Sequence, residues 1–189
     1  MQFKQILLVA CLLICAVQVN AQQKKHKTSP EFRYFTRVAG KADVVFSCPD
    51  GFIELPVKHN GFDFDYGIAI PDQDFEIWFR VIPEKNVEAQ DSSYVDLGRT
   101  EARSLAGDGN YFMRTIPDRV LTDYNADAGK TFLINLPDLD ATKHYKYALL
   151  ITLQKKQEGT IMAICLTNDK GPNFFRNINR ARYCIRFKS

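Results

Sequence analysis

The chain has 189 residues, of which 25 are Lys or Arg, 22 are Asp or Glu and 46% are hydrophobic. This composition excludes collagen-like, low-complexity and highly charged disordered proteins, because it supplies enough apolar surface to offset the entropy lost when the chain is ordered. The formal net charge of +3 does not favour nucleic acid as a partner, since nucleic-acid-binding proteins normally carry a much larger basic excess. A single domain is the expected organisation.

Residues 1–21 have the features of a secretory signal peptide. A short positive segment with Lys4 precedes the uncharged apolar run 6–17, and small residues precede a cleavage site after Ala21. The apolar run is too short to cross a bilayer as a helix, which takes about 20 residues. The alternative, a lipid on Cys11, would leave only about five apolar residues before the modified cysteine, and we disfavour it for that reason. We therefore expect a periplasmic or extracellular protein without a transmembrane segment after cleavage.

Cleavage leaves three of the five cysteines, Cys48, Cys165 and Cys184, in an oxidising compartment. Cys165 lies in the apolar run 161–166 and is expected to be a small buried hydrophobe. If residues 172–183 form a helix that turns back along this run, the rises of strand and helix separate Cys165 from Cys184 by about 15–20 Å, too far for a disulfide. Cys48 and Cys184 are therefore the candidate disulfide, although spacing alone does not fix the connectivity.

The mature chain is expected to begin with a flexible lead at residues 22–42. Residues 22–31 are polar and carry three Lys, a composition typical of a solvated tail. Residues 32–38 contain three aromatic side chains, and we interpret them as a short strand or turn that packs on the domain. The folded domain is then residues 43–189.

Alternating apolar and polar residues predict strands in the first half of this domain. Pro56 places one of them at a sheet edge, because proline cannot donate a hydrogen bond to a neighbouring strand. A turn at residues 71–74 joins the last two strands into a hairpin. In chain order, the predicted strands are residues 43–46, 52–57, 62–70 and 75–81.

The second half is predicted to hold two helices and four strands. Residues 91–93 offer N-cap oxygens for a helix that ends at the Gly-rich segment 107–110, and Pro172 opens a helix that runs to residue 183. The last strand is apolar on both faces, which predicts a central position in the sheet. The strands are residues 111–116, 131–136, 145–153 and 160–167, with an irregular segment after the first. These elements predict an α+β fold in which an antiparallel sheet of about six or seven strands is covered by two helices.

This order of elements over residues 43–187 resembles the Mog1/PsbP-like domains, including the DcrB-like bacterial envelope proteins. The resemblance is carried by the Pro-Asp-Gly-Phe turn at residues 49–52, the hairpin and helix after it, the long hairpin at 145–167 and the terminal helix at 172–183. It implies a non-enzymatic accessory or binding role. It marks no partner, and it transfers no functional residue to a numbered position in this chain.

Residues that could carry chemistry do not form a recognisable set. His26, His59 and His144 lack the spacing of zinc ligands to one another or to a cysteine, and no G-x-S-x-G turn is present. A thiolate at Cys48 with His59 or His144 as its base would make a hydrolase, but an unaligned Cys and His occur in most chains. We therefore expect no catalytic, cofactor-binding or metal-binding residues, with a secreted hydrolase of dispersed catalytic groups as the alternative.

Two features suggest a binding surface. Trp78 and Arg80 share the polar face of their strand, where an exposed tryptophan would anchor a partner; the alternative is that a helix covers this face. Arg176 and Arg180 lie four residues apart on one face of the terminal helix, where they could meet an anionic surface. These four residues predict an accessory protein that binds an envelope protein or an anionic envelope surface. A structural subunit would instead show a long unpaired strand edge.

Overall fold

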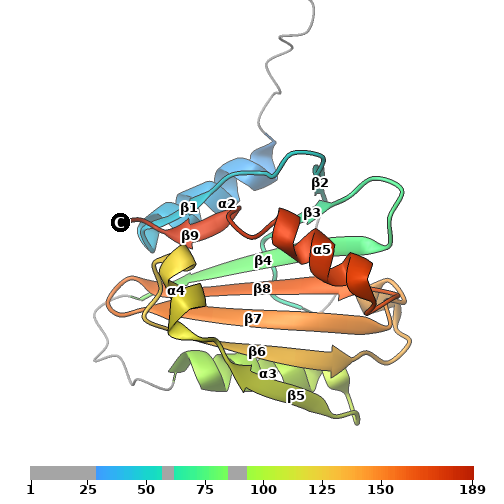
Figure 1. The fold of residues 1–189 in the computed structure, drawn as a ribbon. Helices are drawn as coiled ribbons and strands as arrows, with labels where there is room; N and C mark the ends of the chain where they lie inside the picture. Colours follow the sequence, from blue (N-terminus) through green and yellow to red (C-terminus); the bar gives the residue numbers. More distant parts are fainter. Residues whose placement is uncertain (1–28, 57–61, 85–92) are drawn as a thin grey trace, which may run out of the picture.

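A seven-stranded antiparallel sheet forms the centre of the molecule (Figure 1). The computed structural model describes residues 29–56, 62–84 and 93–189, and within them the chain forms four α-helices, one 3-10 helix and nine strands. The predicted α+β fold with an antiparallel sheet is confirmed. The predicted signal peptide, its cleavage site at Ala21 and Cys11 lie outside the described residues. Among the described residues, no helix is both long enough and apolar enough to span a membrane.

The strands follow the order β2, β3, β4, β8, β7, β6, β5 across the sheet. The middle strand β8 is buried at every residue, which confirms the central position predicted from its two apolar faces. Its neighbours β4 and β7 each pair with it over nine residues. The bounds are β2 Ile53–Leu55, β3 Tyr66–Ala69, β4 Phe75–Pro83, β5 Tyr111–Thr115, β6 Ala128–Asn135, β7 Tyr147–Lys155 and β8 Gly159–Thr167.

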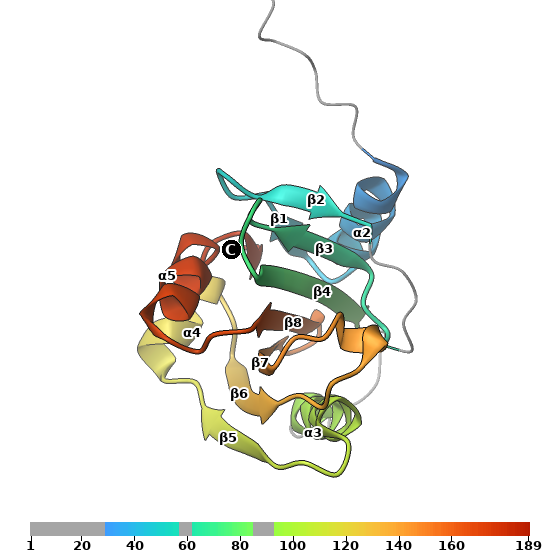
Figure 2. The same ribbon diagram turned by 90° about the vertical axis from the view of Figure 1, so that its right-hand side faces the viewer.

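The back face of the sheet is closed by α3 (Ser93–Ala106), which lies on one side of the lower strands in Figure 2. Leu105 of this helix packs in one buried cluster with Trp78 and Phe132. The helix lies so close to the sheet that a Cβ atom at Gly98 would be 2.5 Å from a ring carbon of Phe132. Only glycine fits at this position without a shift of the ring.

The front face is covered by several smaller elements instead of one helix. Phe35, Phe79 and Phe174 are buried there in a second cluster, and Figure 1 shows α4 and α5 in front of the sheet and α3 behind it. A two-stranded antiparallel ribbon, β1 with β9, belongs to the same layer. The elements of this layer are α2 Pro30–Lys41, β1 Val44–Phe46, α4 Asp118–Tyr124, α5 Pro172–Arg180 and β9 Ile185–Phe187.

Helix α2 corrects the prediction of a flexible lead at residues 22–42. The side chain of Ser29 accepts a hydrogen bond from the Phe32 amide at 2.9 Å and caps the helix, and Pro30 occupies its first turn. Phe35 and Ala39 are 0% and 1% exposed, because this face of the helix packs on the sheet. Residues 30–41 are therefore part of the folded domain, and the strand or turn predicted at 32–38 is a helix.

Two further elements were not predicted, and one helix is shorter than expected. The segment interpreted as irregular after β5 contains α4, which begins after Pro117 and ends at Asn125 in the left-handed region. Strand β9 pairs with β1 from Ile185 onward. Helix α5 ends at Arg180, three residues before the predicted end, because the chain must leave the helix to reach this ribbon.

Candidate functional site

Trp78 is buried, so the prediction of an exposed tryptophan anchor is wrong. Its side chain is 2% exposed and packs under α3, as in the alternative that a helix covers this face. The indole Nε1 donates a hydrogen bond to Glu76 Oε2 at 2.8 Å. Lys143 Nζ donates to both oxygens of Glu76, at 2.9 and 2.8 Å, and lies 5.7 Å from the centroid of the Trp78 ring. Trp78 is therefore part of the hydrophobic core on the back face of the sheet.

The other three residues of the predicted surface do not form one patch with Trp78. Arg80 faces the back of the sheet, where its Nη2 lies 3.5 Å from Asp63 Oδ2. Arg176 and Arg180 lie on α5 in the front layer and line one hollow of about 520 Å³. Two aspartates, Asp74 and Asp169, line the same hollow, so its formal charge is zero. This balance makes the hollow a weak candidate for an anionic partner.

The cysteines of the described residues are free thiols, with Cys48 exposed and Cys184 buried. Both line a hollow of about 490 Å³, where the Ser47 amide donates to the Cys184 carbonyl at 2.7 Å. Burial raises the pKa of the Cys184 thiol to about 12, and the charge of Cys48 adds to the shift. The bond between Cys48 and Cys184 stays a prediction. Cys165 and Cys184 line one cavity of about 30 Å³, and burial, followed by the charge of Cys184, raises the pKa of Cys165, so the terminal helix does not separate the two cysteines as predicted.

His144 is the histidine within the described residues, since His26 and His59 lie outside them. Its Nδ1 lies 2.6 Å from Asp138 Oδ1, and its Nε2 lies 3.0 Å from Asp140 Oδ1. Both ring nitrogens are therefore engaged by carboxylates. In the described part of the chain, no group of three or more His, Cys, Asp and Glu is placed to hold a metal ion.

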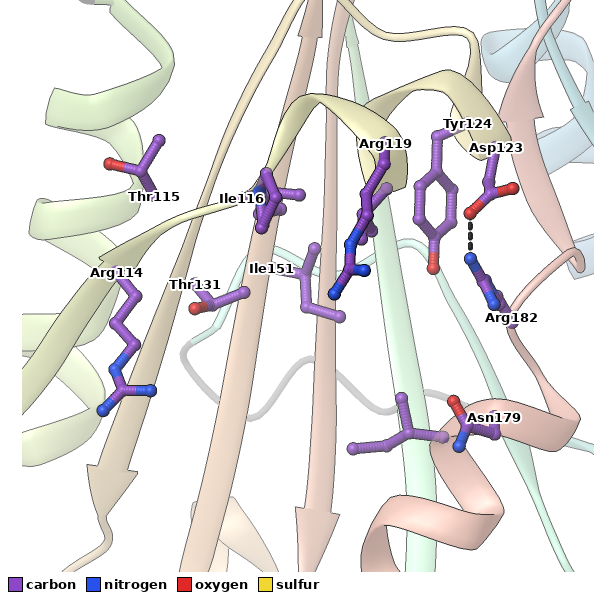
Figure 3. Close-up of a pocket in the computed structure, with 13 residues that line it drawn as sticks. Arg114, Thr115, Ile116, Arg119, Asp123, Tyr124, Thr131, Ile151, Asn179 and Arg182 are labelled. Atoms are coloured by element: carbon purple, nitrogen blue, oxygen red, sulfur yellow. Dashed lines mark hydrogen bonds and ion pairs between the residues drawn. The ribbon is translucent and has the colours of Figure 1, made fainter.

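The front layer leaves a groove of about 800 Å³ over β5, β6 and β7 (Figure 3). We call it the arginine groove. Its charged residues are Arg114 of β5, Arg119 and Asp123 of α4, and Arg182, which follows α5. Three guanidinium groups against one carboxylate give the groove a formal charge of +2. It is therefore more basic than the hollow lined by Arg176 and Arg180, whose formal charge is zero.

The floor of the groove follows from the register of the sheet. Arg114 pairs with Thr131, and Thr131 pairs with Ile151. Residues paired across neighbouring strands point to the same face, so these three side chains form one row on the front. Thr131 and Ile151 are half-buried, because the front layer covers them only in part, whereas their neighbours Phe132 and Leu150 are fully buried on the back.

Helix α4 forms one wall of the groove and is fixed by an ion pair. Asp123 pairs with Arg182 Nη2, which ties α4 to the segment after α5. Figure 3 shows Arg119 extending from α4 over the groove, beside Ile151 and Tyr124. Burial raises the pKa of Tyr124 to about 12, so its hydroxyl keeps its proton at neutral pH and can donate a hydrogen bond to an anion.

Arg119 and Arg114 are available to a ligand. Within the described residues, neither forms an ion pair with a carboxylate, and Arg114 lies 4.9 Å from the ring centroid of the exposed Phe112. A guanidinium presents donors in a planar fork that fits both oxygens of a carboxylate or phosphate. The groove can therefore bind an anion with a free guanidinium group, in the positive field of the other two.

Arg114, Arg119 and Tyr124 stand in no sequence motif that predicts a site. Residues 114 and 182 are far apart in the chain, and they line one groove only because of the order of the strands and the packing of the C-terminal segment on the front of the sheet. No local motif or spacing records this arrangement.

The fold and the groove define a mixed α+β domain with an antiparallel sheet and a basic hollow on its front face. No protein-family model matches the chain, and no curated protein matches its sequence. Among solved structures, the chain is similar to the solution structure of cyanobacterial PsbP (CyanoP) from Synechocystis sp. PCC 6803. The identity is 13% and the TM-score 0.42, over 78% of this chain and 88% of that chain. This is a weak likeness of fold, and we draw no functional conclusion from it.

Proposed function

We propose that the chain is an exported accessory protein that binds an anionic partner in the arginine groove and catalyses no reaction. The observation that supports this proposal is the excess of guanidinium groups in a hollow with a half-buried floor. Charge-assisted hydrogen bonds are stronger than neutral ones, and partial exclusion of water strengthens them further. The signal-like residues 1–21 support a periplasmic or extracellular location, where an envelope protein or an anionic envelope surface would be the partner.

A secreted hydrolase is the second candidate, and the contacts of His144 and the pKa of Cys48 argue against it. His144 has both ring nitrogens engaged by aspartates, so neither is left to take a proton from a nucleophile. Burial raises the pKa of the Cys48 thiol, with further contributions from Glu54 and Asp50. A raised pKa lowers the thiolate population at neutral pH, which is the opposite of what a catalytic cysteine requires.

The experiment measures the affinity of three anions of different shape for the wild-type protein and two variants. Inorganic phosphate, a hexaglutamate peptide and dodecanoate are titrated calorimetrically at low ionic strength, where screening is weakest. Arg119→Gln removes a free guanidinium from the groove. Arg186→Gln removes the same charge from the exposed outer face of β9, outside the groove, and serves as the matched control.

We expect Arg119→Gln to weaken binding of at least one of these anions by about tenfold, the effect of losing a charge-assisted hydrogen bond. Arg186→Gln should change the same affinity by less than about twofold, because a side chain outside the groove forms no hydrogen bond with the ligand and acts on it only through water of high dielectric constant. Equal losses in the two variants would show attraction to the whole protein and would contradict a site in the groove.

A further inference from the structure

The floor of the arginine groove adjoins a small cavity inside the front layer. We call this hollow of about 30 Å³ the inner cavity. Its walls include Phe79, Ile161 and Ala163, and most of its lining is apolar. A buried water molecule needs two to four polar partners, so a cavity with an apolar lining favours an apolar group over water. The inner cavity is therefore suited to the end of an apolar chain.

The groove and the inner cavity share part of their walls. Tyr124, Ile151, Ile178 and Arg182 line both of them. The two hollows therefore adjoin, and we call them together the path: it runs from the guanidinium groups at the rim, over the apolar side chains of the floor, to the wall of the inner cavity. The polar ends of Arg182 and Tyr124 mark the point where the charged part of the path meets the apolar part.

The size and lining of the path favour a small molecule over a protein surface. The groove of about 800 Å³ lies within the usual range for small-molecule sites, roughly 300–1,000 Å³. An acidic protein surface could pair with Arg114 and Arg119, but its carboxylates would bring water over Ile151 and Ile178. A ligand with an apolar chain removes that floor from water, which is favourable in proportion to the area covered.

We infer that the ligand of the arginine groove is an anionic amphiphile, a single apolar chain that carries one carboxylate or phosphate head. This inference rests on the proposed function, because the head occupies the groove of that proposal. Arg119 holds the head with bidentate hydrogen bonds, Arg114 adds positive charge from the side of the groove at β5, and Arg182 sits at the start of the chain. The chain covers Ile151 and Ile178, and its end enters the inner cavity.

The first test is a series of saturated carboxylates from hexanoate to dodecanoate, each titrated into the wild-type protein below its micelle concentration. Affinity should rise by up to about fourfold for each methylene that becomes buried, until the chain fills the path. The affinities of dodecyl phosphate and dodecanoate show which of the two head groups the protein prefers. Dodecanol, which has the chain without the charge, should bind at least about tenfold more weakly than dodecanoate, because it forms no charge-assisted hydrogen bond.

Two variants locate the chain. Ala163→Leu fills the inner cavity and should weaken dodecanoate while leaving hexanoate unchanged. Ile151→Thr makes the floor polar and should lower the gain per methylene, whereas Leu133→Thr, half-buried on the same face outside the groove, should not. Fluorescence of Trp78, which is buried on the opposite face, checks that each variant is folded. The chain-length series on the wild-type protein tests for the amphiphile even where a variant does not fold.

The outcomes distinguish failure of the amphiphile from failure of the proposed function. Binding of phosphate or hexaglutamate in the groove, without any dependence on chain length, overturns the amphiphile and leaves the proposed function standing. Dodecanol binding as tightly as dodecanoate overturns the role of the arginines and therefore both proposals. No binding of any anion in either panel also overturns both. The inference is supported if affinity depends on chain length, and if Ile151→Thr reduces this dependence while Leu133→Thr leaves it unchanged.

Discussion

The two faces of the sheet use the same strands in opposite ways. On the back, one long helix, α3, closes over Trp78 and Phe132, and the contact is so close that Gly98 has no room for a side chain. On the front, short helices and a two-stranded ribbon cover β3, β4 and β8 but leave β5 to β7 partly open. The back face therefore stabilises the fold, while the front face leaves open surface for a ligand.

The largest expected effect comes from neighbouring residues of β6 that point to opposite faces. Phe132 is 0% exposed on the back, and Leu133 is half-buried on the front. Phe132→Ala should lower the free energy of unfolding by about 3–5 kcal/mol, because it leaves a cavity in a closed core. Leu133→Ala should cost only about 1 kcal/mol, since part of its surface already meets water. Equal costs in urea denaturation would contradict the contrast between the faces.

The next effect concerns the predicted bond between Cys48 and Cys184, which would fasten the β1–β9 ribbon of the front layer. In the exported protein, reduction of this disulfide should lower the free energy of unfolding by about 2–4 kcal/mol, because the bond restricts the unfolded chain. Peptide mapping by mass spectrometry without reductant should recover a Cys48–Cys184 peptide. A Cys165–Cys184 peptide would show that the other pair, which shares the inner cavity, forms instead.

Glycine substitutions in two helices compare the tightness of their packing. Gly98→Ala should lower the free energy of unfolding by about 1–3 kcal/mol, because the new methyl group would overlap the Phe132 ring on the back face. Gly40→Ala in α2 meets no atom within 4 Å and should raise it by about 0.5–1 kcal/mol, since alanine favours a helix. Thermal melting of both variants measures the difference. A stable Gly98→Ala protein would mean that α3 can move away from the sheet.

The smallest effect is a pH dependence at the loop between β6 and β7. The hydrogen bond to Asp138, followed by the charge of that residue, raises the pKa of His144 above its ordinary value of 6.5. A raised pKa in the folded state means that this contribution to stability is complete below pH 6.5 and is lost as the pH rises through the folded pKa. The group is fully exposed, so the change should be small. An NMR titration of the His144 ring should give a midpoint above 6.5, and a midpoint at or below that value would contradict the contact.

The regular elements of the sheet could be read from the sequence, because period-two patterns and turn residues are local. β8 is an example: its two apolar faces predicted a covered central strand. Helix α2 also left a signal, since Ser29, Pro30 and Glu31 form an N-terminal cap with an acidic first turn, but its polar neighbours suggested a tail. Helix α4 has seven residues and no side-chain cap, so it left little to detect.

The candidate site could not be predicted, for reasons that are physical. The alternation on β4 placed Trp78 on the correct face, yet its exposure depends on where α3 crosses the sheet. The arginine groove depends on three distant segments that meet through strand order and helix packing. Arg119 in particular carries no mark in its own sequence neighbourhood that distinguishes it from any surface arginine.

The most direct test of the groove is a two-dimensional ¹H–¹⁵N NMR titration of the wild-type protein with dodecanoate. We expect the chemical-shift changes to cluster at Arg119 and Tyr124 of α4, at Ile151 of β7 and at Arg182. The signals of the Trp78 indole and of α3 should stay unchanged. In Arg119→Gln the same shifts should require about tenfold more ligand. Shifts centred on α3 and Trp78, or an unaltered titration in Arg119→Gln, would contradict the claim that the open front face is the binding site.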